Sequence, residues 1–450
     1  MRDAGSIRER RVAGNRLRAH TATILPPRVR KTLTMPRFHL LILTGMALTL
    51  QACEANPSTY PLTVVEGDTL GVPLLTVQGA VERLPAWTVQ PDPTFLVPGD
   101  QPPYLSDVGE IAVLSDGRLV VEDNQSAELW IFDPTAAPKR IASRGDGPGE
   151  IRNVESIKVG RADSIFIFDR RHARMTILSP TGTMTAVVDL PRGVEGEGAL
   201  LVSAWPLGDQ IALHSIRFSD PGDTSEGMRL GSRESVVRIA DRSGRPEDRA
   251  VRFPAGLALI NQRFDGRSPF AADPSITVEG SVVVHARGAE YRLDVRGPDL
   301  SLDRSIHWPD TRQPLLEDDV TRVRTEVEDR FTRNGRASPE RVRALLDQLF
   351  APEVVPDELP ALGTIRMDDS RRLWVQAFRM AGDEWRQEDA WHVLDPSGRP
   401  LARLDLPPDT RLAAVHGDEV VLVRRDELDV QHVGIYTLEQ PPVRPRDMGD

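Results

Sequence analysis

Short apolar runs separated by turn-forming residues recur along most of this chain. The clearest run, residues 119–123 (LVVED), returns 46 residues later at 165–169 (IFIFD). Its surroundings recur at the same offset, since residues 131–134 (IFDP) return as 177–180 (ILSP) and the Gly-Asp pair at 99–100 returns at 145–146. A fixed period of about 40 to 50 residues with about four short strands in each unit is typical of a β-propeller.

Weaker patterns of the same kind predict six such units, or blades, between residues 85 and 440. The predicted blades lie at 107–143, 153–190, 200–239, 281–308, 362–398 and 412–438. Residues 87–97 form a strand with no partner beside it, and the last blade has only three strands before the proline-rich end. We expect this strand to complete the last blade, which closes the ring and leaves no exposed edge. Seven blades is the competing count.

Residues 314–350 interrupt the strand pattern. Apolar residues recur there at three- to four-residue spacing with charged residues between them, which is typical of amphipathic helices. Ser338, Pro339 and Glu340 resemble a helix start, with serine as the N-cap and proline in the first turn. We therefore expect two helices inserted between the fourth and fifth blades of an all-β protein; a charged loop is the alternative.

Residues 35–52 have the pattern of a secretory signal. Arg37 precedes an apolar run at 40–50, which is too short to be a good membrane span. Residues 50–53 (LQAC) resemble the lipobox of bacterial lipoproteins, in which signal peptidase II cuts before the cysteine and the thiol is acylated. Cys53 is the only cysteine, so no intramolecular disulfide can form and lipidation is its simplest role. An ordinary signal peptide or a chance apolar stretch is the alternative.

Residues 1–34 carry nine basic and two acidic residues upstream of this signal. We interpret them as a leader that comes from a start codon assigned too early; a basic RNA-binding tail or a transit peptide is the alternative. Because they contribute +7 and Arg37 adds +1, the net charge of −11 becomes about −19 from Cys53 onward. An acidic body argues against nucleic-acid binding and against electrostatic adhesion to anionic lipid. We expect 53–84 to be a tether and lead-in, and 441–450 a C-terminal tail.

Two motifs resemble a known family. Residues 115–123 (SDGRLVVED) followed by 130–134 (WIFDP) are similar to a blade of the NHL-repeat type, and residues 145–150 (GDGPGE) are similar to the turn that links such blades. The chain most resembles bacterial six-bladed β-propeller lipoproteins, which are largely uncharacterised. The resemblance covers about 90–450 and is specific for the first two blades and for 372–398. It implies a propeller fold and a membrane-anchored place in the cell envelope, on the periplasmic or outer-membrane side, and it implies no activity.

The polar residues best suited to binding follow the second strands of the blades. In a propeller these turns lie on the same face as the crossovers between blades, so we expect their side chains to meet around one mouth of the central channel. The candidates are Asp123, Asn124, Arg144, Asp146, Glu150, Asp169, Arg170 and His172. The alternative is that each aspartate caps its own turn and that the glycines of 144–150 only form a tight crossover.

No pattern typical of catalysis or of metal binding occurs. The histidines stand singly, without HxH, HExxH or CxxC spacing, and no GxSxG motif is present. A metal site would need ligands from several blades, of which His214 and His285 are a candidate pair; buried structural histidines are the alternative. We predict no cofactor, while a divalent cation stays open. The sequence favours a monomeric binding module for an envelope protein, a peptide or a glycan. The alternative is a metal-dependent hydrolase or lyase with its site in the channel.

Overall fold

The computed structural model describes residues 62–97, 102–194, 199–218, 229–260, 265–267, 269–271, 274–333, 338–352, 354–380 and 387–440. The predicted leader, the signal segment, Cys53 and the tail at 441–450 lie outside the described residues. The chain divides after Glu54, and all described residues belong to the second compact unit, Ala55–Asp450. No helix in the described ranges has the length and apolar character needed to cross a membrane.

The repeat detected in the sequence corresponds to two neighbouring four-stranded antiparallel sheets. The first contains β5 (Val108–Val113), β6 (Leu119–Asp123), β7 (Glu128–Asp133) and β8 (Ala136–Ala142). The second contains β9 (Val154–Val159), β10 (Ile165–Asp169), β11 (Arg174–Leu178) and β12 (Met184–Asp189). Both the first and the second strands of the two sheets begin 46 residues apart, as the sequence predicts.

The remaining strands form sheets of the same up-and-down kind. One contains β13 (Gly193–Val194), β14 (Ala199–Leu207), β15 (Gln210–Phe218), β16 (Arg229–Ala240), β17 (Pro246–Ile260) and β18 (Asp265–Arg267). The next contains β19 (Ser275–Glu279), β20 (Val282–Arg287), β21 (Arg292–Arg296) and β22 (Leu302–His307). The last strands are β25 (Ile365–Met367), β26 (Leu373–Gln376), β27 (Asp389–Leu394), β28 (Pro400–Leu406), β29 (Thr410–His416), β30 (Glu419–Arg425) and β31 (Gln431–Glu439). The sequence pattern misses β17, which begins at a proline, and β19, which has only two apolar residues.

Two N-terminal segments add strands to these sheets. β3 (Ala86–Val89) and β4 (Phe95–Leu96) pair antiparallel with β31, and β3 also pairs in parallel with β28. β1 (Thr63–Thr69) and β2 (Val72–Gln78) form a hairpin whose second strand pairs in parallel with β22. Part of the segment expected to be a tether and lead-in is therefore folded onto a sheet. Its prolines hide this from the sequence pattern; Pro73 is tolerated near the start of β2, before the residues Leu74–Thr76 that pair with β22.

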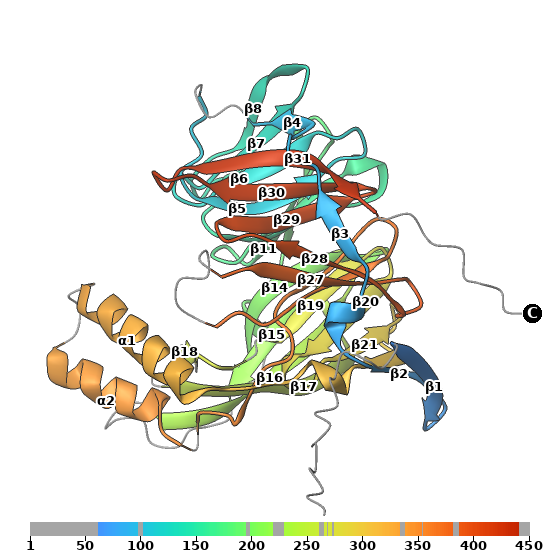
Figure 1. Ribbon diagram of the computed structural model, residues 1–450. Coiled ribbons are helices and arrows are strands. Elements are labelled where there is room, and N and C mark those ends of the chain that lie inside the picture. The colour runs from blue at the N-terminus through green and yellow to red at the C-terminus, as the bar shows by residue number, and fades with distance from the viewer. Residues whose placement is uncertain are drawn as a thin grey trace, which may run out of the picture. The chain divides into compact units, whose positions relative to one another are not determined.

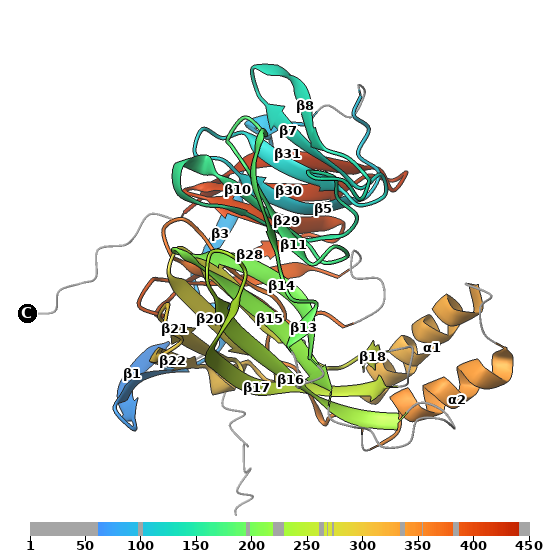
Figure 2. The same ribbon diagram turned by 180° about the vertical axis from the view of Figure 1, so that it is seen from behind.

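The sheets are arranged as in a β-propeller (Figures 1 and 2). The innermost strands contact one another in succession, β29 with β5, β5 with β9, β9 with β14, β14 with β19 and β19 with β25. Each second strand is buried on both faces because it lies between two neighbouring sheets. In β6, for example, Leu119 and Val121 pack against β30 and β31, whereas Val120 packs against β9 and β10. The apolar layers between sheets hold the fold together by removing apolar surface from water.

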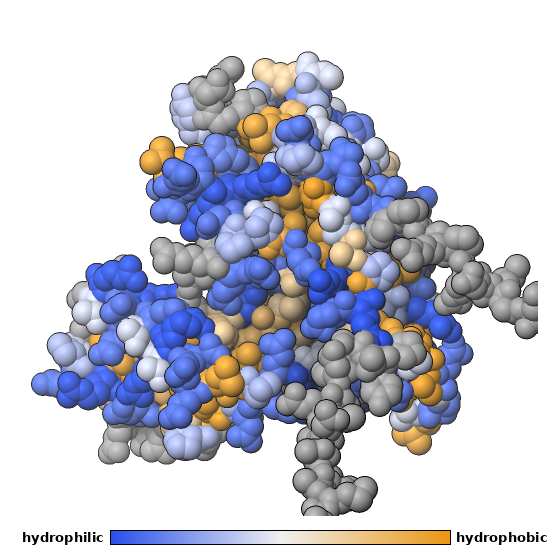
Figure 3. Space-filling model, in the orientation of Figure 1, coloured by the Kyte–Doolittle hydropathy of each residue, from blue (hydrophilic) through white to orange (hydrophobic). Residues whose placement is uncertain are grey.

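The interruption predicted at 314–350 contains two helices, α1 (Glu317–Arg333) and α2 (Pro339–Leu349), which lie side by side in both views (Figures 1 and 2). The Ser338 side chain accepts a hydrogen bond from the Arg341 N–H at 3.4 Å, which confirms the predicted N-cap. Val323 and Leu346 pack with Phe270 in a small core of their own. The face of the molecule seen in Figure 3 is mainly hydrophilic, with scattered apolar patches.

Candidate functional site

The innermost strands surround a central channel with a cavity of about 400 Å³. The cavity is lined by residues of β5, β9, β19, β25 and β29, together with Trp205 of β14. Each of these strands starts at the face where the blades cross over and ends at the opposite face, where short turns lead into the second strands. We call the first opening the crossover mouth and the second the hairpin mouth.

The predicted aspartates hold the turns at the crossover face. Asp123 is buried, and its carboxylate accepts hydrogen bonds from the N–H groups of Asp107 at 3.0 Å and Gln125 at 3.2 Å. Asp169 does the same in the next blade, accepting from the N–H of Arg152 at 2.8 Å and of His172 at 3.2 Å. These contacts tie the second strand of each blade to the segment that enters it. They match the turn-capping alternative.

His172 joins two of the predicted carboxylates. Its Nδ1 lies 2.7 Å from Asp169 Oδ2, and its Nε2 lies 2.9 Å from Asp146 Oδ1. Arg152 also donates to Asp146, at 2.9 and 3.1 Å. The hydrogen bonds from Arg152, and then those from His172, hold the pKa of the Asp146 carboxyl well below its usual range. The group is internally paired and links the crossover turn to the second blade.

The other predicted residues also have partners within the loops. Arg144 donates to the carbonyl oxygens of Gln125 at 2.7 Å and Ser126 at 3.2 Å, and Glu150 accepts from the Gly147 N–H at 2.7 Å. Arg170 pairs with Glu155 at 3.0 Å. The predicted set therefore does not converge around one ligand space. Only Asn124 and Arg170 lie beside the group of charges described next.

A buried glutamate that the sequence analysis missed lies at the crossover mouth. Glu122 is only 2% exposed, and its carboxylate accepts the Glu110 N–H at 3.1 Å. Burial, and after it the nearby carboxylates of Glu110 and Glu155, raise the pKa of Glu122 from 4.5 to about 8, against hydrogen bonds from the backbone. The position 46 residues later holds Phe168, which lies in the apolar core. This departure from the repeat is a signal that the sequence contains.

Two arginines belong to the same region. Arg366 on β25 lines the channel, and its buried Nε has no hydrogen-bond partner among the described residues. Arg411 on β29 donates to the Val108 carbonyl oxygen at 3.0 Å. Burial lowers the pKa of Arg411, as does the charge of Arg366, while the Glu110 carboxylate raises it. The crossover mouth therefore brings together carboxylates of the first two blades and guanidinium groups of the later ones.

The hairpin mouth carries a second set of charges. Lys158 pairs with Glu279 at 3.7 Å, and His416 Nδ1 lies 3.2 Å from Asp369 Oδ2. Burial raises the pKa of Glu279, and the Lys158 ammonium opposes this shift. These residues lie at the ends of β9, β19 and β29 and in the turn after β25.

The candidate histidine pair is buried in an apolar layer. The rings of His214 and His285 stack against Trp205 and Phe253, respectively, and His214 Nε2 lies 2.5 Å from Ser235 Oγ. Burial lowers the pKa of each histidine to about 3, so both are neutral at ordinary pH. Within the described ranges, no group of three or more His, Cys, Asp or Glu side chains is placed to hold a metal ion.

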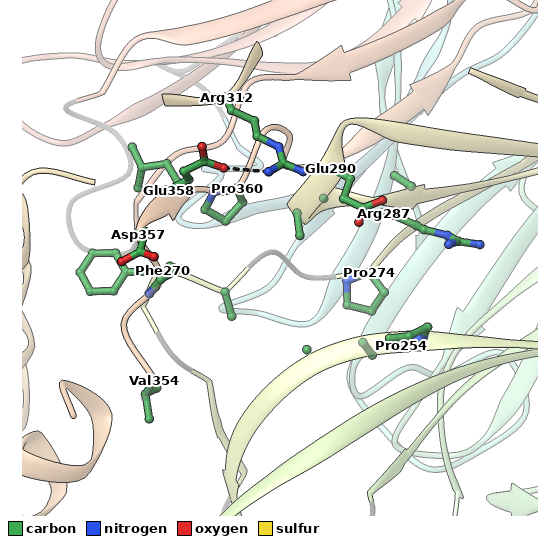
Figure 4. Close-up of a pocket in the computed structure, with 18 residues that line it drawn as sticks. Pro254, Phe270, Pro274, Arg287, Glu290, Arg312, Val354, Asp357, Glu358 and Pro360 are labelled. Atoms are coloured by element: carbon green, nitrogen blue, oxygen red, sulfur yellow. Dashed lines mark hydrogen bonds and ion pairs between the residues drawn. The ribbon is translucent and has the colours of Figure 1, made fainter. Parts of the chain in front are cut away.

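A larger cavity of about 780 Å³ lies beside the helical segment (Figure 4). Its lining is rich in proline and small residues, and Arg312 and Glu358 form an ion pair at 2.8 Å on one side of it. Glu290 and Arg287 also line it, but the Arg287 guanidinium is bound to the buried Asp294 at 3.1 Å. The charged residues at the channel mouth differ from these, because they lie on innermost strands that contact a neighbouring sheet.

We expect Glu122→Gln to stabilise the protein in weakly alkaline solution. The folded state keeps a proton on Glu122 up to about pH 8, whereas the unfolded chain releases it near pH 4.5, so folding becomes less favourable as the pH rises between these values. The amide removes this cost, and the gain should be on the order of 2 to 4 kcal/mol at pH 8 and near zero at pH 4.5. Urea denaturation at both pH values measures it. Glu82→Gln, at an exposed position, is the control; equal effects of the two variants would contradict the account.

Comparisons with known proteins leave the family open. No family model matches the sequence, and no curated protein matches it. Among solved structures, a candidate exported protein of Bacteroides fragilis has 13% identity and a TM-score of 0.40. The match covers 79% of this chain and 95% of that protein's chain. A member of the DUF4221 family from Bacteroides vulgatus has 10% identity and a TM-score of 0.46, with 84% and 99% covered. Virginiamycin B lyase from Staphylococcus aureus has 9% identity and a TM-score of 0.37, with 75% and 97% covered. All three scores are below 0.5, so the fold assignment rests on the strand pairing described above.

Proposed function

We propose that this chain is a binding module whose propeller holds a ligand bearing both a positive and a negative group at the crossover mouth. The observation that carries the proposal is the division of charge around the channel. Glu110 and Glu155 lie on neighbouring strands, and Arg366 lies on β25 with Arg411 behind it. A charged peptide end or a small zwitterion offers an ammonium to the glutamates and a carboxylate to the arginines. Such pairs gain strength where water is partly excluded.

The proposal includes a ring of six blades. Blades one to six would be β5–β8, β9–β12, β14–β17, β19–β22, β25–β28 and β29–β31, with β3 and β4 supplying the outer strand of the last blade. The helices α1 and α2 would then be an insertion between the fourth and fifth blades. This closure supports the binding proposal because a rigid ring holds charges from distant parts of the chain at fixed positions.

The proposal also places the protein in the cell envelope, tethered by lipid on Cys53. The support is the lipobox-like sequence at 50–53 behind an apolar run. Each methylene of an acyl chain that enters the membrane contributes about 0.8 kcal/mol. The partner in this proposal is an envelope protein, a peptide or a glycan, and the acidic body argues against nucleic acid. Function as a monomer and without a cofactor is part of the same proposal.

We expect Cys53→Ala to move the protein from the membrane fraction to the soluble fraction, or to leave it unprocessed. Alanine offers no thiol for acylation, so no lipid chain can hold the protein to the membrane. Fractionation after metabolic labelling with palmitate measures both effects. Ser126→Ala, in a loop of the described body, is the control and should keep both the label and the membrane association. Unchanged labelling and fractionation of the Cys53 variant would contradict lipidation at this residue.

The binding proposal is tested with Glu110→Gln and Arg366→Gln. Each removes one charge from the channel mouth and keeps a polar side chain there, and each should weaken binding of the zwitterion trialanine about tenfold. Glu340→Gln and Arg343→Gln, on the exposed face of α2, are the matched controls and should bind trialanine as the unmodified protein does. Equal affinity in all four variants would place recognition away from this mouth.

A further inference from the structure

A third cavity opens between two blades on the hairpin face. It measures about 720 Å³ and lies between the β10–β12 part of the second sheet and the start of β15 in the next. Its walls include Phe166, Ile177 and Val188, which are only partly buried although they belong to the apolar layer between sheets. The layer between these two sheets is therefore incomplete near its outer edge. We call this cavity the interblade groove.

A glycine helps to form the floor of the groove. A Cβ atom at Gly160 would lie 2.6 Å from a ring carbon of Phe166, so the aromatic ring lies directly over the backbone there. The φ angle of Gly160 is −107°, and this glycine is therefore not required by its backbone conformation. Its role is to let the ring lie flat. The result is an apolar surface that borders the groove and faces Pro206 and Ile211.

Positive charge surrounds the apolar part. Four cationic side chains line the groove against two carboxylates; they are Lys158, Arg161, Arg242 and Arg371 against Asp209 and Glu279. This excess stands out in a chain whose net charge is −11. Arg242 is paired with Asp209, and Lys158 with Glu279. Within the described part of the chain, the Arg161 and Arg371 guanidinium groups have neither an ion pair nor a side-chain hydrogen bond.

We propose that the interblade groove binds an apolar carboxylate. Its aliphatic or aromatic group would lie on Phe166, Ile177 and Val188, and its carboxylate would pair with Arg161 and Arg371. Guanidinium groups bind carboxylates with two parallel hydrogen bonds, and burial of the apolar group supplies the rest of the affinity. The groove opens at the hairpin face, so this site is separate from the charges of the crossover mouth and does not depend on the function proposed above.

An apolar carboxylate can come from two sources, a free organic acid or the C-terminal residue of a peptide. The test is a calorimetric titration of the full chain with 3-phenylpropionate and with the peptide N-acetyl-Gly-Gly-Phe, whose acetyl group removes the ammonium that the crossover mouth would bind. The neutral counterparts are 3-phenylpropionamide and N-acetyl-Gly-Gly-Phe amide. We expect at least one carboxylate to bind and its amide to bind at least tenfold more weakly. Which of the two acids binds identifies the source. Binding of neither acid, or equal binding of acid and amide, would overturn the proposal.

Substitutions assign the binding to the groove. Arg161→Gln and Arg371→Gln should each raise the dissociation constant about five- to tenfold, and Val188→Trp should abolish binding by filling the groove. Arg343→Gln, an exposed arginine on α2, is the matched control and should change nothing. Both groove arginine variants should still bind trialanine normally, because that ligand tests the other mouth. Unchanged affinity for the apolar acid in both arginine variants would overturn the assignment.

Discussion

Replacing Val97 by aspartate should destabilise the protein on the order of 3 to 5 kcal/mol, because it places a charge in the apolar layer between the first and last sheets. Val97 is 3% exposed, its N–H donates to the Val433 carbonyl oxygen at 2.9 Å, and its side chain packs with Val108 and Val421. This is where the N-terminal segment joins the C-terminal strands. The described residues that pack with Val97 in this layer are apolar and offer the new carboxylate no partner.

The adjacent residue provides a matched control. Leu96 is the last residue of β4 and is 46% exposed, so Leu96→Asp should cost about 1 kcal/mol or less. Denaturant titration followed by circular dichroism gives both values. Similar losses for the two variants would show that Val97 is not buried between the first and last sheets, and the proposed closure of the ring would then be wrong.

Acidification should also produce a large effect, through three buried histidines. Burial lowers the pKa to about 3 for His214 and His285 and to about 4 for His392, whereas histidine in an unfolded chain titrates near 6.5. Below pH 6.5 the unfolded chain therefore binds protons that the folded state does not. Each histidine should then lower the stability by about 1.4 kcal/mol per pH unit until its own folded-state pKa is reached.

Glu122 opposes this trend. Its folded-state pKa of about 8 lies above its unfolded value, so the stability it contributes grows as the pH falls from 8 towards 4.5. The net loss between pH 6.5 and pH 4.5 should be roughly 5 kcal/mol. Urea denaturation over this range measures it. His285→Phe should make the fall in the free energy of unfolding shallower by about 1.4 kcal/mol per pH unit, the value for one proton, and Glu122→Gln should make it steeper by about the same amount. A decline that neither substitution alters would contradict the assignment to these side chains.

The repeat in the sequence was sufficient to predict the architecture in those parts of the chain where apolar residues fill whole strands. β6 and β10 lie between two sheets, so both faces are apolar and the run stands out. β1 lies at a sheet edge and is largely exposed, and β2 contains a proline, so the pattern of this hairpin is weak and a tether was the natural interpretation. The start of α2 was readable because the cap is a local interaction of Ser338.

The candidate site was predictable only in part, for a physical reason. The sequence led to the crossover face through Asp123 and Asp169, but these carboxylates bond to backbone groups a few residues away in space and so serve their own turns. Glu122 was within reach, because the repeat places a buried phenylalanine at the equivalent position. Arg366 was not predictable, since only the folded chain brings β25 to the same cavity as residues of β9, which lie far away in the sequence.

The measurement that most directly tests the central claim is a calorimetric titration of the full chain with trialanine and with N-acetyl-trialanine amide, which has the same backbone without the terminal charges. The account predicts that trialanine binds with one site per chain, that the capped peptide binds at least tenfold more weakly, and that added salt weakens the trialanine complex. Equal affinity for the two peptides, or no binding of either, would contradict recognition through the opposed charges of the crossover mouth.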